Sequence, residues 1–477
     1  MRRACLAAAA AAIATLAWAG PASAFSKQDL LLPMDDGAPL AASLYLPDGT
    51  APAGGWPAVI LMHGLAGDRA SMNTLAQSMG LVGEDYAVLT FDARGHGLSG
   101  GLIGIDGPRE ISDVRGVFTW LAARPDVADG KIGAWGISYG GGAALNSLAA
   151  GVPWAAVEVA ETWSELLSAL VPQGLAKSGV IGGFVTALPP AKVDPAVFAV
   201  RDAAFAGRID EVRAFAVERS SLARLAGNRT PVFLMQGRRD YAFGLDQATR
   251  LYGALAGPKR LWIGNHGHPP STFPAIDSAA MLAEGRQWFD RYLRNVSNGI
   301  ERKPPVVLAR EGRATAVSYA GLPPTRRFSF TPGQAVSFKK TPARTIAQSG
   351  RWLQEVRLRG DAEVFGSPTV RVTATVTGGW SRLVVTLSAR TAAGREIAVS
   401  AGGVPARPGT HTYQVALLHQ ATYVPAGSTW KVTVASSTLA QSPGNLMYLD
   451  LPMPAAARLT VRSVTFSWPA LRAPVSR

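Results

Sequence analysis

One serine of this chain stands in a setting that would make it a nucleophile. Ser138 lies at the centre of the sequence Gly136-Ile137-Ser138-Tyr139-Gly140, after the apolar run 132–135 and before a helix-compatible run that starts at Gly142. A sharp strand-to-helix turn needs small residues two positions on either side of the serine, because a Cβ there would clash, and the turn projects the hydroxyl above the sheet edge. The context therefore predicts nucleophilic attack on a carbonyl carbon by Ser138.

Two carboxylates are candidates for the acid that orients the histidine of such a serine. A neutral imidazole must accept the serine proton, and a carboxylate must orient and stabilise that imidazole. Along a chain with this turn the order is serine, acid, histidine. We predict Asp240, which follows the apolar run 232–235 at the end of a short loop. Glu161, at the end of the preceding predicted strand, is the alternative, since neighbouring strand ends can reach the same imidazole.

The base is expected from the loop 264–269, which holds His266 and His268 among only six histidines in the chain. We predict His268, because the longer reach past Gly267 would bring its imidazole over the serine. A metal bound by the His-x-His pair is the other interpretation, but no third ligand cluster stands nearby in the sequence. We therefore predict no metal site and no cofactor.

The anionic oxygen of a tetrahedral intermediate needs preorganised donors. One is expected from the backbone N–H of Tyr139, the residue after the nucleophile. The other should follow the first core strand, where His63-Gly64-Leu65 occurs, and the N–H of Leu65 is the predicted donor. His63 itself is interpreted as structural.

Short β-rich runs alternate with helical stretches from residue 40 to residue 263, which is typical of a parallel sheet flanked by helices. The runs are continuously apolar, as expected for strands covered on both faces. The predicted strands are 59–62, 87–91, 132–135, 156–159, 232–235 and 260–263, and the predicted helices include 109–123 and 277–295. Residues 162–225 interrupt this rhythm and read as a helical cap. Together with the serine turn, these features predict an α/β-hydrolase fold over residues 25–300.

The pattern changes after Pro304-Pro305, where residues alternate with period two between turns that contain Gly and Pro. Residues 301–477 are therefore predicted as a C-terminal all-β jelly roll, a galactose-binding-like sandwich. They hold 22 Lys and Arg against 7 Asp and Glu, whereas residues 25–300 hold 23 against 26. This asymmetry suggests a weak contact of the second domain with an anionic envelope surface rather than with nucleic acid, the alternative being solubility alone.

The N-terminus has the composition of an export signal. Arg2 and Arg3 precede an Ala-rich apolar run, and Ala22-Ser23-Ala24 offers a cleavage site of small residues. We predict a signal peptide over residues 1–24 and a secreted or periplasmic location. The only cysteine, Cys5, lies within this segment, so the mature chain would form no disulfide.

These motifs together resemble hydrolases related to X-prolyl dipeptidyl peptidase and bacterial cocaine esterase. The resemblance rests on the serine turn, on the loops that carry Asp240 and His268, and on a basic β module with Gly366-Ser367-Pro368. It implies a Ser138-Asp240-His268 triad, a helical cap and a jelly roll that borders the active site. The His63-Gly64-Leu65 segment differs from the tyrosine donor frequent in that group and looks like the backbone donor of simpler esterases.

The expected function is that of an exported serine hydrolase that cleaves esters or amides of a small-molecule or peptide substrate through an acyl-enzyme. A serine exopeptidase of the X-prolyl dipeptidyl-peptidase type is the alternative within the enzyme class. It requires a carboxylate in the cap for the substrate ammonium, and Glu161, Glu165 and Asp194 are candidates. An envelope-binding protein with a decayed triad is the alternative from another class.

Overall fold

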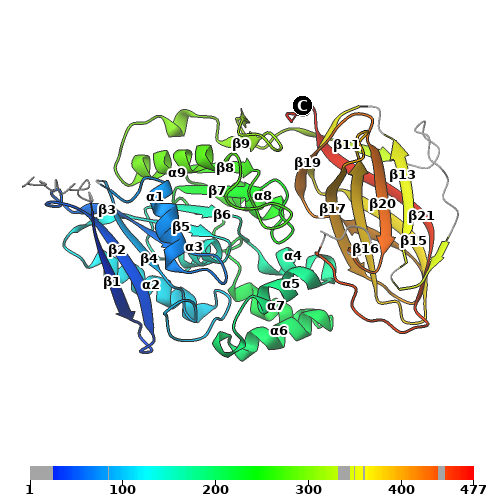
Figure 1. Ribbon diagram of the computed structural model, residues 1–477, viewed down its shortest axis with the longest axis horizontal. Coiled ribbons are helices and arrows are strands. Elements are labelled where there is room, and N and C mark those ends of the chain that lie inside the picture. Colours follow the sequence, from blue (N-terminus) through cyan, green and yellow to red (C-terminus); the bar gives the residue numbers. More distant parts are fainter. Residues whose placement is uncertain are drawn as a thin grey trace, which may run out of the picture.

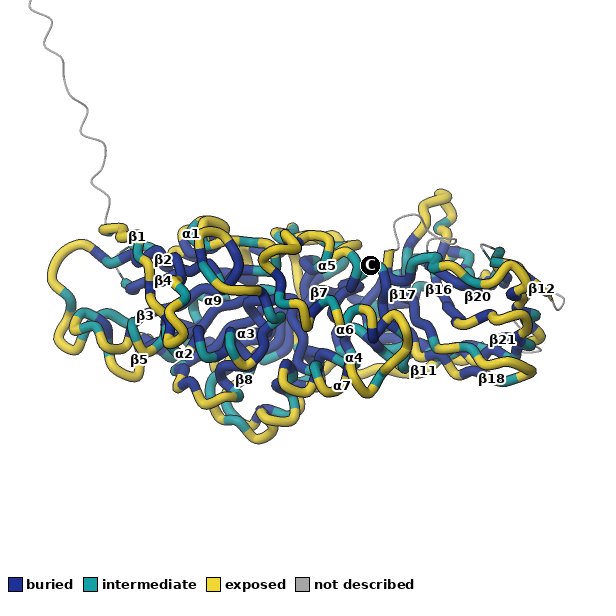
Figure 2. The backbone as a smooth tube through the Cα atoms, turned by 90° about the horizontal axis from the view of Figure 1, so that it is seen from below, coloured by how far each residue is buried: buried dark blue, intermediate teal, exposed yellow. Residues whose placement is uncertain are grey.

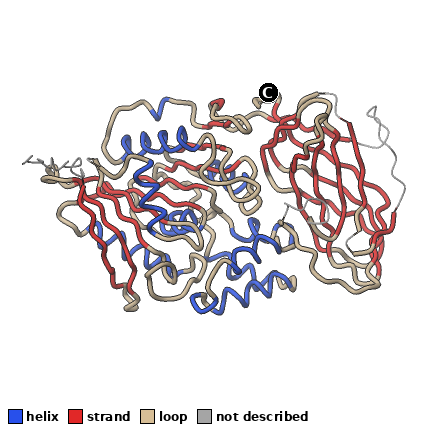
Figure 3. The backbone as a smooth tube through the Cα atoms, in the orientation of Figure 1, coloured by secondary structure: helices blue, strands red, loops and turns tan. Residues whose placement is uncertain are grey.

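The computed structural model of the chain contains two bodies, one a sheet flanked by helices and the other built of strands, with a further group of helices beside both (Figure 1). It describes residues 25–83, 85–330, 344–348, 350–357, 360–438 and 446–476. The predicted signal segment 1–24 lies outside the described residues. Figure 3 shows helices gathered in the N-terminal body and only strands in the C-terminal one.

The first body is built on a ten-stranded sheet with the order β1-β2-β4-β3-β5-β6-β7-β8-β9-β10. Strands β4 to β9 of this order run parallel, whereas β1, β2 and β10 pair antiparallel at the two edges. The strands are β1 (Phe25–Pro33), β2 (Pro39–Pro47), β3 (Trp56–Met62), β4 (Ala87–Phe91), β5 (Val127–Ile137), β6 (Ala156–Ala160), β7 (Val232–Gly237), β8 (Lys259–Gly264), β9 (Val306–Ala309) and β10 (Ala316–Tyr319). All six strands predicted from apolar runs are present.

Helices cover both faces of this sheet, which explains why its central strands are mostly apolar and why the backbone there is buried, dark blue in Figure 2. Helices α2 (Pro108–Ala122), α3 (Tyr139–Ala149) and α8 (Leu245–Ala254) pack on one face. Helices α1 (Arg69–Ser78) and α9 (Ser278–Tyr292) pack on the other. With the structural matches reported below, this arrangement confirms the α/β-hydrolase fold. None of the helices formed by the described residues is both long and apolar enough to cross a membrane.

The segment 162–225 contains four α-helices, two single-turn 3-10 helices and no strand, as its composition predicted. The α-helices are α4 (Leu166–Leu170), α5 (Ser178–Thr186), α6 (Pro195–Phe205) and α7 (Ile209–Glu218). The segment lies between β6 and β7, and Figure 1 shows its helices beside the second body. Their apolar residues form small clusters of their own and also contact Tyr139 and Phe243 of the first body. The cap therefore stands over the end of the sheet where the serine turn lies.

The second body is a sandwich of two antiparallel sheets around one apolar core. One sheet has the order β18-β15-β21-β14-β19, with β11 and β12 also paired to β21, and the other has the order β13-β20-β16-β17. Its strands are β11 (Thr325–Phe330), β12 (Arg344–Ile346), β13 (Trp352–Arg357), β14 (Ala362–Gly366), β15 (Thr369–Thr377), β16 (Arg382–Arg390), β17 (Glu396–Pro405), β18 (Gly409–Ala416), β19 (Gln420–Val424), β20 (Thr429–Ala435) and β21 (Arg458–Leu471). The predicted all-β domain is present.

The first sheet continues past residue 300, where we placed the end of the hydrolase domain. Val306–Ala309 pairs parallel to β8 and is completely buried, and Ala316–Tyr319 returns antiparallel beside it. The prolines before β9 were interpreted as the point where the all-β pattern begins, yet an apolar run of four residues is long enough to add a covered strand to the first sheet. The boundary between the two sheet systems therefore lies after residue 319.

Candidate active site

The turn at Ser138 has the geometry that its glycines predicted. Ser138 has a φ of 53° between β5 and α3, a conformation that is uncommon for a residue other than glycine. A Cβ on Gly136 would lie 2.2 Å from the carbonyl oxygen of Gly140, and one on Gly140 would lie 2.1 Å from that of Met62. Only glycine fits either position, so the turn holds the half-buried serine in a strained orientation at the end of β5.

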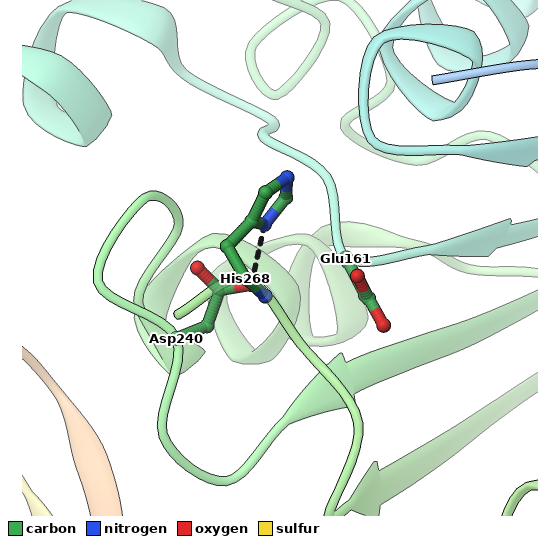
Figure 4. A group of neighbouring side chains, drawn as sticks. All are labelled: Glu161, Asp240 and His268. Atoms are coloured by element: carbon green, nitrogen blue, oxygen red, sulfur yellow. Dashed lines mark hydrogen bonds and ion pairs between the residues drawn. The ribbon is translucent and has the colours of Figure 1, made fainter. Parts of the chain in front are cut away.

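Three side chains from distant parts of the chain form one hydrogen-bonded series at this edge. Ser138 Oγ lies 2.8 Å from Nε2 of His268, and Nδ1 of His268 lies 2.8 Å from Oδ2 of Asp240. The other carboxylate oxygen of Asp240 accepts hydrogen bonds from the backbone N–H groups of Ala242 and Phe243, at 2.8 and 2.9 Å. The carboxylate is thus fixed on both oxygens, and Figure 4 shows its contact with the imidazole.

The charges of this series keep the carboxyl of Asp240 ionised and make the imidazole of His268 more basic. Burial by itself would raise the pKa of Asp240, but the charge and hydrogen bond of His268 outweigh it and hold that pKa below its ordinary value. Burial would lower the pKa of His268, yet the charge and hydrogen bond of Asp240 raise it above 6.5. The imidazole is therefore a stronger base than a free histidine.

The raised pKa of His268 sets the pH dependence that we expect. The imidazole must be neutral to accept the serine proton, so kcat/KM should fall as the pH falls through a value above 6.5. A pH profile with a soluble ester between pH 5 and 9 measures this limb. An acid limb below the ordinary histidine value of about 6.5 would contradict the raised pKa of His268.

The structure separates the alternatives that the sequence left open. His266 is fully buried and packs edge-on against Phe273, and its pKa is lowered to about 4 by burial. It makes no contact with Ser138. Glu161 lies at the end of β6 with ligand atoms within 4.8 Å of those of Asp240 and His268, but Asp240 holds the hydrogen bond to Nδ1. Nδ1 of His268 and the carboxylate of Asp240 are thus already engaged with each other through a hydrogen bond.

The two residues predicted to bind the oxyanion border the serine. Tyr139 and Leu65 line the same cavity as Ser138, and a Cβ on Gly64 would lie 3.7 Å from the Cβ of the serine. The loop after β3 is thus brought against the serine turn. His63 supports this loop, because its Nε2 accepts a hydrogen bond from the backbone N–H of Ala93 at 2.9 Å. The structural interpretation of His63 is therefore confirmed, and donation to an oxyanion stays a prediction.

Glu110 is a functional neighbour that sequence reasoning missed. Its carboxyl accepts a hydrogen bond from the hydroxyl of Tyr139 at 2.5 Å and also binds the backbone N–H groups of Gly104 and Gly107 at 2.7 Å. It therefore fixes the residue that follows the nucleophile. In the sequence Glu110 is only an acidic residue in the first turn of a helix, and no local pattern links it to residue 139.

A cavity of about 100 Å³ opens at Ser138 between the sheet edge and the cap. Its walls are aliphatic and aromatic side chains, most of them from the cap, including Leu166, Leu167, Leu170, Ile181, Phe184, Val200, Phe215 and Phe243. Leu166, Leu170 and Phe184 of the cap line it, whereas Val180 packs against this group and against Tyr241, and Leu188 packs beside Val193 and Val197. Among the described residues that line the cavity, Arg201 is the only charged one, and no carboxylate is present.

The loop that carries Asp240 is held from two sides. From the cap, the buried Lys177 Nζ donates to the carbonyl oxygens of Tyr241 and Ala242, at 2.9 and 2.8 Å. From the second body, the N–H of Ala421 donates to the carbonyl oxygen of Arg238 at 2.8 Å. The carbonyl oxygen of His419 accepts a hydrogen bond from the N–H of Leu245 at 2.9 Å. The acid of the triad is therefore positioned by parts of the chain that precede and follow it by many residues.

A buried ion pair also anchors this loop to the second body. Arg238 contacts Glu363 of β14 at 2.5 Å, and both side chains are nearly inaccessible to solvent. Glu363 also accepts hydrogen bonds from the N–H groups of Val475 and Ser476. Breaking such a pair leaves an uncompensated buried charge, so the sandwich, its C-terminal segment and the acid loop are linked.

Comparison with known proteins supports the resemblance drawn from the motifs. The X-Pro dipeptidyl-peptidase (S15) family matches residues 36–197, which include the serine turn and part of the cap. No curated protein sequence matches the chain significantly.

Solved structures match nearly the whole chain at low sequence identity. A CocE/NonD family hydrolase from Staphylococcus aureus is similar with a TM-score of 0.71 at 14% identity, over 94% of both chains. An aminopeptidase from a marine sediment archaeon, Thaumarchaeota archaeon, gives 0.69 at 14% identity, over 94% of this chain and 97% of that one. An α-amino acid ester hydrolase gives 0.69 at 16% identity over the same shares. The two-body architecture is therefore shared, and with the S15 match these findings indicate a hydrolase.

Proposed function

We propose that this protein, a hydrolase similar to the X-Pro dipeptidyl-peptidase and cocaine esterase group, is a serine esterase. Its substrates carry an apolar acyl group. The observation that carries the proposal is the hydrogen-bonded series Ser138-His268-Asp240 at the mouth of an apolar cavity. Amide cleavage uses the same residues, so the reaction class is acyl transfer to water through an acyl-enzyme.

The hydrogen-bonded series Ser138-His268-Asp240 supports the following mechanism. Ser138 Oγ attacks the ester carbonyl carbon as its proton passes to Nε2 of His268, and the N–H groups of Tyr139 and Leu65 stabilise the oxyanion. His268 then gives the proton to the leaving alcohol, and the acyl group stays on Ser138. A water molecule next transfers a proton to His268 and attacks the acyl carbon, which releases the carboxylic acid and restores the serine hydroxyl.

The character of the cavity favours an uncharged acyl group over an amino-terminal peptide. An exopeptidase must pair the substrate ammonium with a carboxylate, because burying an unpaired charge is costly. Glu165 and Asp194, which the sequence offered for this role, cap helices α4 and α6 and do not line the cavity. Glu161 does not line the cavity either. The cavity instead buries alkyl groups, at about 25 cal/mol per Å² of apolar surface.

A fluorophosphonate probe and a substrate panel test the proposal together. The probe should label the wild-type protein and not Ser138→Ala, because only an activated serine reacts with it. Among p-nitrophenyl esters, kcat/KM should rise from acetate to longer straight chains and exceed that for Ala-Pro and Gly-Pro anilides by at least about 100-fold.

Two results would reject this reading. Labelling that persists in Ser138→Ala would remove the assignment of the nucleophile. Faster cleavage of the X-Pro anilides than of the esters would favour the dipeptidyl-peptidase alternative. The match to the S15 family is the reason for testing this alternative. The ordered series of the three side chains speaks against a decayed triad.

We further propose that the enzyme acts outside the cytoplasm. The support is the basic, Ala-rich segment of residues 1–24 with its small-residue cleavage site. N-terminal sequencing of the protein recovered from the periplasm or the medium of an expressing bacterium should give Phe25 as the first residue. A chain that stays in the cytoplasm with its N-terminus intact would contradict export.

A further inference from the structure

Glu161 combines three features that the proposed mechanism does not use. Its side chain is buried, with one carboxyl oxygen that has no hydrogen-bond partner. Its backbone has a φ of 54°, which is costly for a residue with a side chain. It occupies the end of β6, beside the strand whose end carries Asp240. A buried acid with an unsatisfied oxygen destabilises a fold, so this position calls for a functional account.

The surroundings of Glu161 are those of the triad itself. Its ligand atoms and those of Asp240 and His268 all lie within 4.8 Å of one another, and Figure 4 shows the three side chains together. The backbone N–H of Gly267, next to His268, also interacts with the carboxyl. The ionisable groups that face it are thus Asp240 and His268, whose imidazole is in turn influenced by Lys177.

The charge state of Glu161 follows from this environment. Burial, and after it the negative charge of Asp240, raise the pKa of Glu161 to about 8, while His268 acts in the opposite direction. Near neutral pH the carboxyl is therefore mostly protonated while Asp240 is ionised. Two carboxylates this close do not readily ionise together, and the one that is better solvated by hydrogen bonds keeps the charge. Both oxygens of Asp240 accept hydrogen bonds, whereas one oxygen of Glu161 has no partner.

We propose that Glu161 is a positioning residue that serves as a reserve acid, which supports the imidazole of His268 when the carboxylate of Asp240 is absent or neutralised. This inference rests on the proposed function, because it concerns the same triad. In the intact site Glu161 is neutral and holds the loop of His268 through Gly267. Once Asp240 no longer repels it, Glu161 ionises and supplies the negative charge that stabilises the imidazolium.

The test compares four proteins: wild type, Glu161→Gln, Asp240→Asn and the double variant. The readout is the second-order rate of fluorophosphonate labelling from pH 6 to 10, which needs no knowledge of the natural substrate. Glutamine has the shape of a protonated glutamate, so Glu161→Gln should label within about threefold of wild type at pH 7. Asp240→Asn should label more slowly, and the double variant should be at least about tenfold slower again.

The pH profile separates a reserve acid from a merely structural residue. In Asp240→Asn the labelling rate should rise along a limb that reports ionisation of Glu161, and that limb should vanish in the double variant. Glu161→Asp in the Asp240→Asn background should restore part of the rate, because it keeps a carboxylate at this position. Thermal unfolding of each variant establishes that the comparison concerns folded protein.

Two outcomes would overturn the inference. Equal labelling rates and equal profiles for Asp240→Asn and the double variant would show that Glu161 gives no support. A loss in Glu161→Gln as deep as that of Asp240→Asn would make it an obligatory acid and not a reserve. Absence of labelling in the wild type would instead reject the proposed function, so the two failures are distinguishable.

A second inference concerns the outer face of the sheet β18-β15-β21 with β11, which carries unpaired positive charge. The strands of this sheet face contain no Asp or Glu. Five arginines on them are exposed. Arg326 lies over the ring of Phe328, and the other four, Arg327, Arg371, Arg458 and Arg462, are here called the arginine face; no salt bridge joins any of these four to a described acidic residue. On the opposite sheet, Lys431 pairs with Glu396 and Arg390 lies near Glu355.

Hydroxyl groups accompany these arginines along an open groove. The groove has a volume of about 510 Å³, and Arg327 and Arg371 line it together with Thr369, Gln414, Thr465 and Ser467. None of the large apolar side chains exposed on the described surface lies on these strands. A membrane surface favours apolar anchors beside basic residues, whereas a sugar polymer offers hydroxyls and carboxylates, which suit Ser, Thr, Gln and the arginine fork.

We infer that the arginine face binds an anionic polysaccharide. Retention of the mature protein on immobilised polygalacturonate should fall as salt rises, and Arg327→Ala with Arg371→Ala should weaken it at least about tenfold. Arg390→Ala on the opposite sheet is the matched control and should bind like wild type. Equal retention of the double variant and the control would overturn the inference, as would binding to anionic lipid vesicles without binding to the polymer.

Discussion

Replacing His268 with alanine should lower kcat for ester hydrolysis by about 10⁵-fold or more, since removing the base of a serine triad costs nearly as much as removing all its members. The imidazole contacts both Ser138 and Asp240 at 2.8 Å, and no other histidine reaches the serine. Steady-state kinetics with a p-nitrophenyl ester measure the loss, and circular dichroism establishes that the variant is folded.

Two other histidines serve as controls for this prediction. His411→Ala, in the second body, should leave kcat unchanged, because its ring contacts only the carbonyl oxygen of Pro408 and Tyr413. His266→Ala should act mainly on stability, as a buried side chain is removed. If His268→Ala kept more than a few per cent of the activity while His266→Ala lost it, the base would have to be reassigned.

Gly140→Ala should disable the site through the backbone alone. The new Cβ would lie 2.1 Å from the carbonyl oxygen of Met62 and 2.7 Å from that of His63, so the loop that presents Leu65 must move. Overpacking of this kind costs about 1–3 kcal/mol in stability, and misplacing one oxyanion donor costs about 10²–10³ in kcat. Urea unfolding and kinetics on the same preparation check both effects.

Gly183 provides the matched control in the cap. It lies inside α5 with nothing within 4 Å of a Cβ, and Gly→Ala in a helix stabilises by about 0.5–1 kcal/mol. Gly183→Ala should therefore keep full activity and unfold at a slightly higher urea concentration. Wild-type kinetics in Gly140→Ala would show that the serine turn tolerates a side chain and would contradict the steric account.

The sequence was most informative where one local rule decides the structure. Apolar runs bounded by Gly, Pro or Asp predicted the six central strands, because a strand covered on both faces has no polar positions. The serine turn was predicted for a comparable reason, since Gly136 and Gly140 are fixed by contacts within a few residues and with the adjacent strand. The order serine, acid, histidine then narrowed the search to the loops that hold Asp240 and His268.

Features that depend on contacts between distant segments were less predictable. Strand β9 (Val306–Ala309) was assigned to the second domain, because only its pairing with β8 shows where it belongs. Glu110 acts through a hydrogen bond from the hydroxyl of Tyr139. No sequence motif predicts this contact. The choice between Asp240 and Glu161 required coordinates, since both stand at the ends of neighbouring strands and only their hydrogen bonds differ.

The contacts of residues 238–245 with the cap and with the sandwich have a consequence for truncated forms of this protein. A truncated gene that ends after β10 would encode a complete ten-stranded sheet, yet the segment that carries Asp240 would lose its contacts with residues 363 and 419–421. Such a fragment could be well folded and still hydrolyse nothing. Any exchange of C-terminal modules between related hydrolases would, for the same reason, alter turnover as well as attachment.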